Sequence, residues 1–398
     1  MYEMELSDMK YLVIIADGAA DYNIAQLDNK TPLQYAQTPN IDKLASSADI
    51  GLVQTIPQGF PPGSDVANLS VMGFDPRLYY TGRSPLEAVS MGVKLEDQDL
   101  ALRCNLVCLS PEGLYQDKTM VDYSAGEIST EESGKLIAEL QAQLGNEEFS
   151  FHAGISYRHL VVWKNGASKD LKLTPPHDIS DRLVGEYLPQ GRDASKLLQL
   201  MMQSEEILKN HPVNQERINK GQSPATSIWF WGEGRRPSLP TFEEKYGLKG
   251  SVVCAVDLVR GLGICAGLNP VKVAGATGSV ETNFAGKARA ALDELKRGQD
   301  FVFLHIESPD EAGHQGNLKS KLWSIEKIDK EVVSLLLAEM DNFDQLRVML
   351  LPDHRTPISI RTHSSEPVPF LIYDKNNPIS GGAGKYDEDS ALNGPLVA

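Results

Sequence analysis

Apolar strand-like runs alternate with helical patterns at the start of the chain. Residues 11–16 (YLVIIA) form a β-favouring run without alternation, which is typical of a central parallel strand buried on both faces. A helical pattern opens at Thr38, before a proline, and a second strand is predicted over residues 50–54. This succession of strand, helix and strand predicts an α/β domain.

The last third of the chain has the same pattern. Strands are predicted over residues 251–255, 271–274, 301–306 and 347–351, and a helix over residues 327–340. Each strand is followed by a turn or by the start of a helix. We therefore predict that the two ends of the chain, residues 1–86 and 250–398, build one α/β domain with a mostly parallel sheet flanked by helices.

The middle of the chain differs from both ends. Short strands are predicted over residues 101–108, 157–163 and 227–231, and helices over residues 131–144 and 194–209. Strands and helices are here less regularly interleaved than in the flanking segments. We therefore predict an α+β domain over residues 87–249, inserted into the first domain.

Composition and charge narrow the range of partners. The chain has 398 residues, of which 41% are hydrophobic and 23% charged, as in globular proteins. Its formal charge of -16 opposes binding to a polyanion, so nucleic acid is not an expected partner. No apolar run is long enough to cross a bilayer and no signal peptide precedes the first strand, so we expect no membrane association and a cytoplasmic location. The four cysteines lack the spacing of a zinc site and are expected to be buried thiols.

Acidic residues and histidines follow three of the predicted strands. In an open parallel sheet, ligands bind beyond the carboxyl ends of the strands, so these residues are the candidates for chemistry. The first strand is followed by Asp17, and the two late strands are followed by pairs of acid and histidine, with one more histidine beyond them: Asp310, His314, Asp353, His354 and His363.

The spacing of these residues suits a metal centre. Asp310 and His314 are four residues apart, so one helical turn places both side chains on one face, where they can share a cation. Asp353 and His354 are adjacent, so on a loop they can serve two different ions. A set of aspartates and histidines suits Mn²⁺ or Zn²⁺ better than Ca²⁺, which prefers oxygen ligands alone.

Ser64 is the candidate nucleophile. It follows a loop made rigid by prolines and glycines and precedes a helical pattern over residues 65–72. At a helix N-terminus, backbone N–H groups and the helix dipole favour an alkoxide or an attached phosphate. Because a serine hydroxyl is a poor nucleophile at neutral pH, it needs a base or a metal ion. Two divalent ions would nearly balance the charges of three aspartates and a Ser64 alkoxide until an anionic phosphate arrives.

Blocks along nearly the whole chain resemble those of the archaeal-type cofactor-independent phosphoglycerate mutases, within the alkaline phosphatase superfamily. They include IADGAADY, PPGSDVANLSVMGFDP, GATGSVETNFAGKA, ESPDEAGHQGN and LPDHRTPISIRTHSSEPVPF. The resemblance implies an alkaline-phosphatase-like fold, two divalent metal ions and a phosphorylated Ser64. It implies one ion held by Asp17, Ser64, Asp353 and His354, and the other by Asp310, His314 and His363.

The resemblance also implies that the inserted domain handles the substrate, a small phosphorylated carboxylic acid. Guanidinium groups suit the carboxylate and the phosphate of such a molecule. The candidates in matching blocks of the insert are Arg103, Arg158, His159, Arg235 and Arg236. Arg260, at the predicted domain junction, is a further candidate for the phosphate.

The leading hypothesis is an isomerase in which Ser64 takes the phosphoryl group of 3-phosphoglycerate and returns it to the 2-oxygen, without 2,3-bisphosphoglycerate. Two alternatives use the same phosphoserine: a homoserine kinase-like phosphotransferase of the same family, and a metal-dependent phosphomonoesterase. The sequence has no P-loop for a nucleotide, which favours the mutase over the kinase. A non-catalytic protein with the same fold would be expected to have lost some of the seven metal-site residues, and none is missing.

Overall fold

A computed structural model describes residues 9–111, 113–166 and 170–397. The chain divides into two compact units, of which the first contains the residues up to Tyr80 and from Ser238 onward, and the second contains Thr81–Pro237. The sequence pattern put these divisions at 86/87 and 249/250. In the structure, helix α5 (Ser84–Ser90) belongs to the second unit and helix α9 (Phe242–Tyr246) to the first.

The first unit is built around a mostly parallel sheet with β1 (Met9–Ala16) at its centre. Strand β1 pairs in parallel with β10 (Phe301–Ile306) on one side and β11 (Gln345–Leu351) on the other. The sheet continues through β8 (Gly250–Val253) to β9 (Asn269–Val271), and through β12 (Val368–Asp374) to β2 (Asp49–Val53) and β13 (Leu396–Val397). Only β12 among these strands runs antiparallel to its neighbours. The predicted fold class is confirmed.

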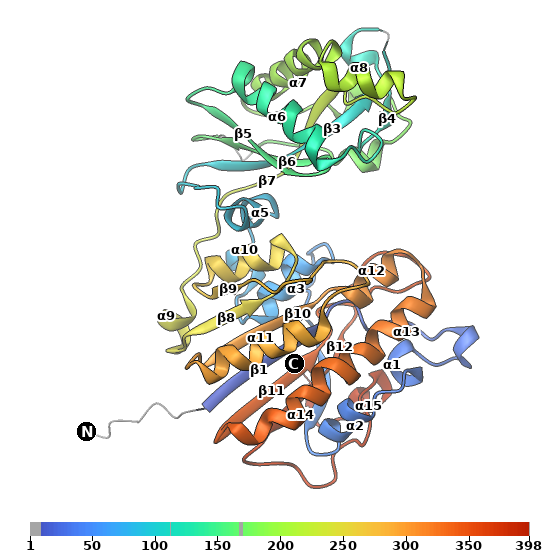
Figure 1. The fold of residues 1–398 in the computed structure, drawn as a ribbon, viewed down its shortest axis with the longest axis vertical. Helices are drawn as coiled ribbons and strands as arrows, with labels where there is room; N and C mark the ends of the chain where they lie inside the picture. The colour runs from blue at the N-terminus through green and yellow to red at the C-terminus, as the bar shows by residue number, and fades with distance from the viewer. Residues whose placement is uncertain (1–8, 112, 167–169, 398) are drawn as a thin grey trace. The chain divides into compact units, whose positions relative to one another are not determined.

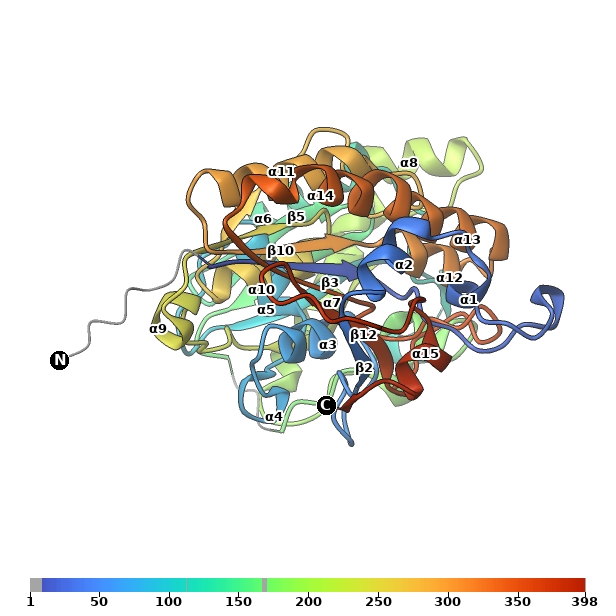
Figure 2. The same cartoon turned by 90° about the horizontal axis from the view of Figure 1, so that it is seen from below.

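Helices cover both faces of this sheet, as Figure 2 shows from below. One face carries α2 (Pro39–Ala45), α11 (Phe284–Lys296), α13 (Leu318–Lys327) and α14 (Ser334–Glu339). Helix α3 (Ser64–Val71) lies on the opposite face, packed against α10 (Asp257–Cys265). Alternate strand residues such as Ile14 and Leu304 are buried in one core with Leu292 of α11, which is why β1 and β10 are mostly apolar.

Three details of the first unit differ from the sequence-based expectation. The strand predicted over residues 271–274 lies earlier, at Asn269–Val271, because an edge strand tolerates Pro270 within it. The helix predicted over residues 327–340 begins at Leu318 and includes a π-helical segment, Ile328–Val333. Strand β12 was not predicted.

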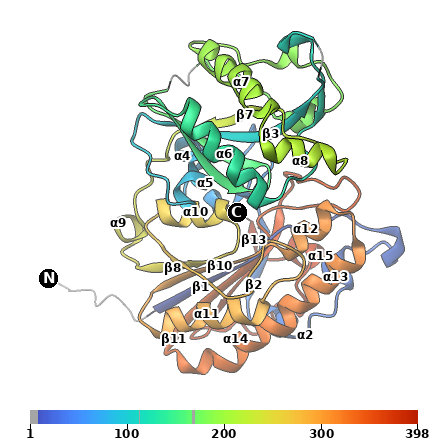
Figure 3. The same cartoon turned by 45° about the horizontal axis from the view of Figure 1, so that its top comes forward.

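The second unit is an α+β unit with an antiparallel sheet (Figure 1). The sheet contains β4 (Met120–Asp122), β3 (Leu100–Leu109), β6 (Arg158–Trp163), β5 (Phe149–Ile155) and β7 (Ser227–Gly234), with β7 paired to β3. Helices α6 (Thr130–Leu144) and α7 (Ala194–Lys209) cover one face, and α5 lies on the other (Figure 3). Leu102 and Leu106 of β3 point into the core below α6 and α7, whereas Ala101 packs with Ala88 of α5.

Within the described residues, no helix combines the length and the apolar character that a membrane span requires. All four cysteines are buried thiols, as expected: Cys104, Cys108, Cys254 and Cys265.

Candidate functional site

The segments that follow strands β1, β10 and β11 of the first unit lie close together at Gly18. Asp17 follows β1 directly, and the next residue, Gly18, has a φ of +63°. A Cβ atom at Gly18 would lie 2.5 Å from Oγ1 of Thr356 and 2.7 Å from Cα of Asp310. Only glycine fits there, because a side chain would push apart the segments that follow β1, β10 and β11.

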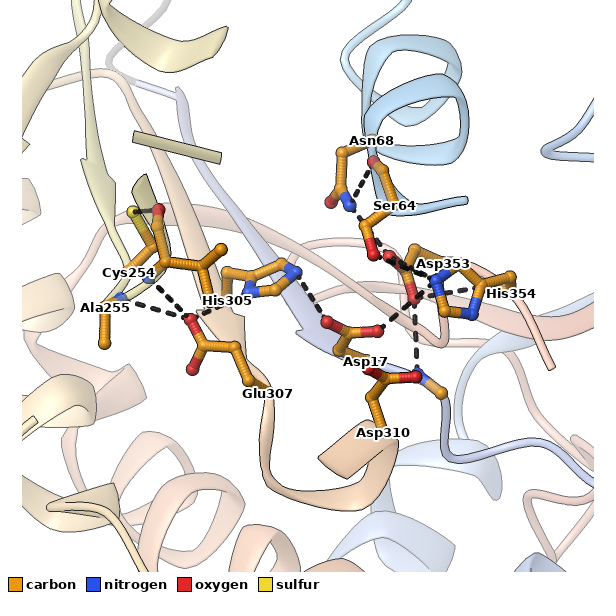
Figure 4. A network of polar contacts seen from close by, with 12 residues as sticks. Asp17, Ser64, Asn68, Cys254, Ala255, His305, Glu307, Asp310, Asp353 and His354 are labelled. Atoms are coloured by element: carbon orange, nitrogen blue, oxygen red, sulfur yellow. Dashed lines mark hydrogen bonds and ion pairs between the residues drawn. The ribbon is translucent and has the colours of Figure 1, made fainter. Parts of the chain in front are cut away.

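Ser64 is the first residue of α3, one position before the predicted start of that helix. It is half-buried, and its Oγ lies 3.0 Å from Nε2 of His354. One turn along the helix, Nδ2 of Asn68 donates a hydrogen bond of 2.8 Å to the carbonyl oxygen of Ser64. The hydroxyl of Ser64 therefore faces the strand-end residues from the N-terminus of its helix (Figure 4).

The first predicted set of metal ligands lies together around this hydroxyl. Nε2 of His354 is 3.5 Å from Oδ2 of Asp353 and 3.6 Å from Oδ1 of Asp17. The side chains of Asp17, Asp353 and His354 are buried. Two ligands bound to one ion at about 2.1 Å lie roughly 3 to 3.5 Å apart, so these separations are compatible with a shared ion.

The second predicted set lies beside the first. Asp310 and His314 occupy one face of helix α12 (Ser308–His314), with 3.3 Å between Oδ2 and Nε2. The other carboxylate oxygen, Oδ1 of Asp310, is 3.4 Å from Nε2 of His363, and the Nε2 atoms of the two histidines are 2.9 Å apart. The ring centres of His354 and His363 are 4.1 Å apart, which brings the two sets into contact.

The electrostatics of this cluster favour a cation. Burial and the negative charges of Asp353 and Asp310 raise the pKa of Asp17 well above its usual range. A hydrogen bond to Asp310 raises the pKa of His314 to about 9, while burial lowers the pKa of His354. Buried Oδ1 of Asp17 has no hydrogen-bond partner among residues 9–111, 113–166 and 170–397. A divalent ion fits this site, because it would satisfy that oxygen and offset the repulsion between carboxylates.

His305 is a buried residue of the site that the sequence-based reasoning did not single out. Its Nε2 lies 3.3 Å from Oδ2 of Asp17, and its Nδ1 lies 3.2 Å from Oε1 of Glu307. Nζ of Lys287 is 2.5 Å from Oε2 of Glu307. Burial opposes ionisation of Glu307, but Lys287 and His305 lower its pKa to about 2. The only signal in the sequence was a histidine at the fifth position of an otherwise apolar strand.

Potential ligand atoms fall into two groups. One atom from each of Asp310, His354 and His363 lies within 4.8 Å of the others, and the same holds for Asp17, His305 and Asp353. His354 thus belongs by distance to both predicted sets, since its Nε2 is also near Asp17 and Asp353.

The arginines that are candidates for binding the substrate lie on several different elements. Arg103 forms an ion pair with Glu87 and lies 4.5 Å from the ring centre of Trp231. Arg158 is exposed, with its guanidinium 5.4 Å from the ring of Tyr157. Arg103 is opposite Leu160 across the β3–β6 pair, two residues from Arg158, so both arginines share one face of the sheet.

The remaining candidates do not join that face. His159 is paired with Cys104 on the opposite face, and burial lowers its pKa to about 3. Nη2 of Arg235 donates to the carbonyl oxygen of Gly166 over 2.8 Å, and Arg236 is exposed. Arg260 lies on α10 in the first unit, with Nη1 3.0 Å from Oδ1 of Asp257.

Comparisons with known proteins give a consistent result. The family model for 2,3-bisphosphoglycerate-independent phosphoglycerate mutase matches residues 45–214. A probable mutase of this type from Geobacter sulfurreducens is 50% identical, covering 98% of this chain and 96% of its own length. The mutase of Methanosarcina barkeri is 48% identical over the same shares of the two chains.

Two solved structures are also similar over both units. A protein from Pyrococcus horikoshii is 29% identical with a TM-score of 0.81, covering 98% of this chain and 93% of that one. The cofactor-independent phosphoglycerate mutase from Thermoplasma acidophilum is 27% identical with a TM-score of 0.68, covering 98% and 96%.

Proposed function

Because the chain belongs to the family of 2,3-bisphosphoglycerate-independent phosphoglycerate mutases, we propose that it interconverts 3-phosphoglycerate and 2-phosphoglycerate as an isomerase. The observation that carries this proposal is the position of the Ser64 hydroxyl, 3.0 Å from Nε2 of His354, which is itself a potential metal ligand. Both phosphoglycerates are intermediates of glycolysis, so we propose that the enzyme works in the cytoplasm.

We propose the following metal ligands. Asp17, Ser64, Asp353 and His354 would hold one divalent ion, and Asp310, His314 and His363 would hold the other. The mixture of carboxylate oxygens and imidazole nitrogens suits Mn²⁺, with Zn²⁺ as the second choice. Such ions, when bound, would lower the pKa of the serine hydroxyl and offset the negative charge of a phosphoryl group.

Ser64 is the proposed nucleophile. Its Oγ forms a bond to phosphorus as the bond from phosphorus to the 3-oxygen of the substrate breaks, which leaves a phosphoserine and glycerate. The 2-oxygen of glycerate then attacks the same phosphorus, and Ser64 leaves. The position of Ser64 in the first turn of α3 supports this role, because the positive end of the helix dipole stabilises the charge of a phosphoserine.

We assign substrate handling to the second unit. Glycerate must turn between the two transfers while the phosphoserine is kept from water, which would otherwise hydrolyse it. Arg158 is the leading candidate for the substrate carboxylate, because its guanidinium is exposed on the same sheet face as Arg103. The ion pair of Arg103 with Glu87 and the backbone contact of Arg235 support positioning roles for these two residues.

The test is a coupled assay for 2-phosphoglycerate with purified protein, Mn²⁺ and 3-phosphoglycerate, without 2,3-bisphosphoglycerate and without ATP. We expect turnover that stops on chelation and returns with Mn²⁺. Release of inorganic phosphate without 2-phosphoglycerate would favour the phosphomonoesterase instead. Product formation only with ATP and homoserine would favour the phosphotransferase.

A further inference from the structure

The imidazole of His305 lies between two carboxylates in the interior of the first unit. Its side chain is fully buried in β10, with Nδ1 3.2 Å from Glu307 and Nε2 3.3 Å from Asp17 (Figure 4). The contact with Asp17 lacks hydrogen-bond geometry, so Nε2 is a buried nitrogen without a hydrogen-bond partner in the part of the chain that the structure describes. None of the roles assigned above uses this ring.

The surroundings of Glu307 determine which nitrogen of His305 carries the hydrogen. The carboxylate of Glu307 accepts hydrogen bonds from the backbone N–H groups of Ala255 and Val256, at 3.1 and 3.2 Å. It also accepts one from Nζ of Lys287. Nδ1 of His305 lies 3.2 Å from the same carboxylate, so the tautomer with its hydrogen on Nδ1 gives Glu307 a fourth donor and directs the lone pair of Nε2 toward Asp17.

Nε2 of His305 faces the carboxylate of Asp17. Nε2 of His305 and Oδ2 of Asp17 are 3.3 Å apart without a hydrogen bond between them, and Oδ1 of Asp17 likewise has no hydrogen-bond partner among the described residues. Ligand atoms of Asp17, His305 and Asp353 lie within 4.8 Å of one another. Buried acceptors that converge in this way are costly unless a cation joins them.

We propose that Nε2 of His305 is an additional nitrogen ligand of the metal centre, bound to an ion that Asp17 and Asp353 also bind. The two carboxylate oxygens of Asp17 lie near different histidines, Oδ2 near His305 and Oδ1 near His354. Glu307 and Lys287 are positioning residues that fix the ring and its tautomer, as carboxylates behind metal-bound histidines commonly do. The ions that suit this position are those that accept imidazole, such as Mn²⁺ and Zn²⁺, in preference to Mg²⁺ or Ca²⁺.

This inference rests on the metal centre proposed above, and the experiment separates the two. Full-length protein is loaded with Mn²⁺, and pulsed electron paramagnetic resonance with ¹⁵N-histidine labelling counts the imidazole nitrogens coupled to the ions. We expect four in the wild-type protein: those of His305, His314, His354 and His363. Three or fewer would overturn the role of His305, and failure to bind Mn²⁺ at all would overturn the metal centre itself.

The variant His305→Gln adds a second measurement. We expect it to lose one coupled nitrogen and to raise the Kd for Mn²⁺ on the order of 10-fold or more. The matched control is His159→Gln, since His159 is also buried, with no hydrogen-bond partner for Nε2 among the described residues, but belongs to the second unit. If a folded His305→Gln keeps all couplings, His305 is not a ligand, whatever the change in affinity.

Discussion

Nδ2 of Asn68 lies 2.8 Å from Oδ2 of Asp353 and joins the helix of the nucleophile to the segment that follows β11. The same nitrogen donates to the carbonyl oxygen of Ser64 over 2.8 Å. One buried amide therefore sets the distance between the serine and a proposed metal ligand. Because a metal centre depends on the orientation of its ligands, Asn68 should affect the metal without touching it.

Replacing Asn68 with alanine tests this relationship. We expect the Kd for Mn²⁺ to rise by about 10- to 100-fold, because Oδ2 of Asp353 loses the amide donor that helps to orient the carboxylate. Loss of a buried hydrogen bond should also lower the free energy of unfolding by about 1–3 kcal/mol. The control is Asn214→Ala, since the buried amide of Asn214 makes hydrogen bonds of 2.7 and 2.8 Å in the second unit. Calorimetric titration with Mn²⁺ should separate the two variants, and equal affinities would refute the orienting role.

Replacing Ser64 with alanine should abolish mutase turnover. Without the hydroxyl no phosphoserine forms, and loss of a nucleophile lowers kcat by on the order of 10⁴-fold or more. Fold and metal content should be largely kept, because Asp17, Asp353 and His354 are also proposed to hold the same ion. Ser70→Ala on the same helix is the control, since the Ser70 hydroxyl donates to the carbonyl oxygen of Val66 over 3.1 Å. Substantial residual turnover in Ser64→Ala would rule out the phosphoserine route.

Metal affinity should rise with pH up to about 9. The hydrogen bond to Asp310 raises the pKa of His314 to about 9, so in the metal-free protein this imidazole is protonated at neutral pH. An ion must displace that proton, so affinity should fall by up to about tenfold per pH unit below 9. Titrations in buffers of different ionisation enthalpy should show proton release at pH 7. His314→Gln should lose that release, and a flat affinity between pH 6 and 9 in the wild type would contradict the assignment.

The same raised pKa has the opposite effect on the stability of the metal-free protein. A pKa that is higher in the folded than in the unfolded state adds stability below the unfolded value of about 6.5, and this stability is lost as pH rises through about 9. The Tm of the metal-free wild type should therefore fall over this window more than the Tm of His314→Gln. Thermal unfolding in chelator, at several pH values, measures the difference.

Replacing Arg158 with glutamine should lower kcat/KM for phosphoglycerate more than for a substrate without a carboxylate. A charge-assisted contact with the substrate carboxylate contributes roughly 1.5–3 kcal/mol, which corresponds to about 10- to 100-fold in kcat/KM. Hydrolysis of an aryl phosphate, which lacks that carboxylate, should change little. Arg182→Gln is the control, because Arg182 is an exposed arginine of the second unit whose guanidinium donates, through Nη1, to the Tyr187 hydroxyl over 3.2 Å. Equal losses on both substrates would favour a plain phosphatase.

Removal of the second unit should separate metal binding from isomerisation. A protein in which a short flexible linker replaces Thr81–Pro237 retains every proposed metal ligand. We expect it to bind Mn²⁺, to lose mutase activity and to gain slow phosphatase activity, since water then reaches the phosphoserine. Mutase activity of the shortened protein would show that the first unit handles the substrate alone.

The acidic residues that follow the strands of the site could be predicted from the sequence. Asp17, Asp310 and Asp353 each follow a strongly apolar run, and parallel strands that pair side by side bring their carboxyl ends together. The four-residue spacing of Asp310 and His314 likewise predicted one helix face, and both lie on α12. The positions of these residues could be predicted from the local sequence, because each pattern that indicates them lies within one strand or one helical turn.

Other features depended on pairing between distant segments. Strand β12 lies between two strands from opposite ends of the chain and was missed, because its run is followed by no candidate residue. His305 was counted as part of an apolar strand, although Asp17 on the neighbouring strand gives it a polar partner. The face on which His159 lies depends on the register between β3 and β6, which no pattern within either strand reveals.

The order of strands in the first sheet also has a consequence for synthesis of the protein in the cell. Strand β2 ends at Val53, shortly before Ser64, yet its sheet partners are β12, which begins at Val368, and β13 near the C-terminus. A growing chain therefore emerges with β2 unable to pair until the last strands have been translated. The second unit has its own core and can fold in the meantime. Such long-range pairing is slow, and chains that stop before β12 should reach no metal-binding state and should instead be substrates for chaperones and proteases.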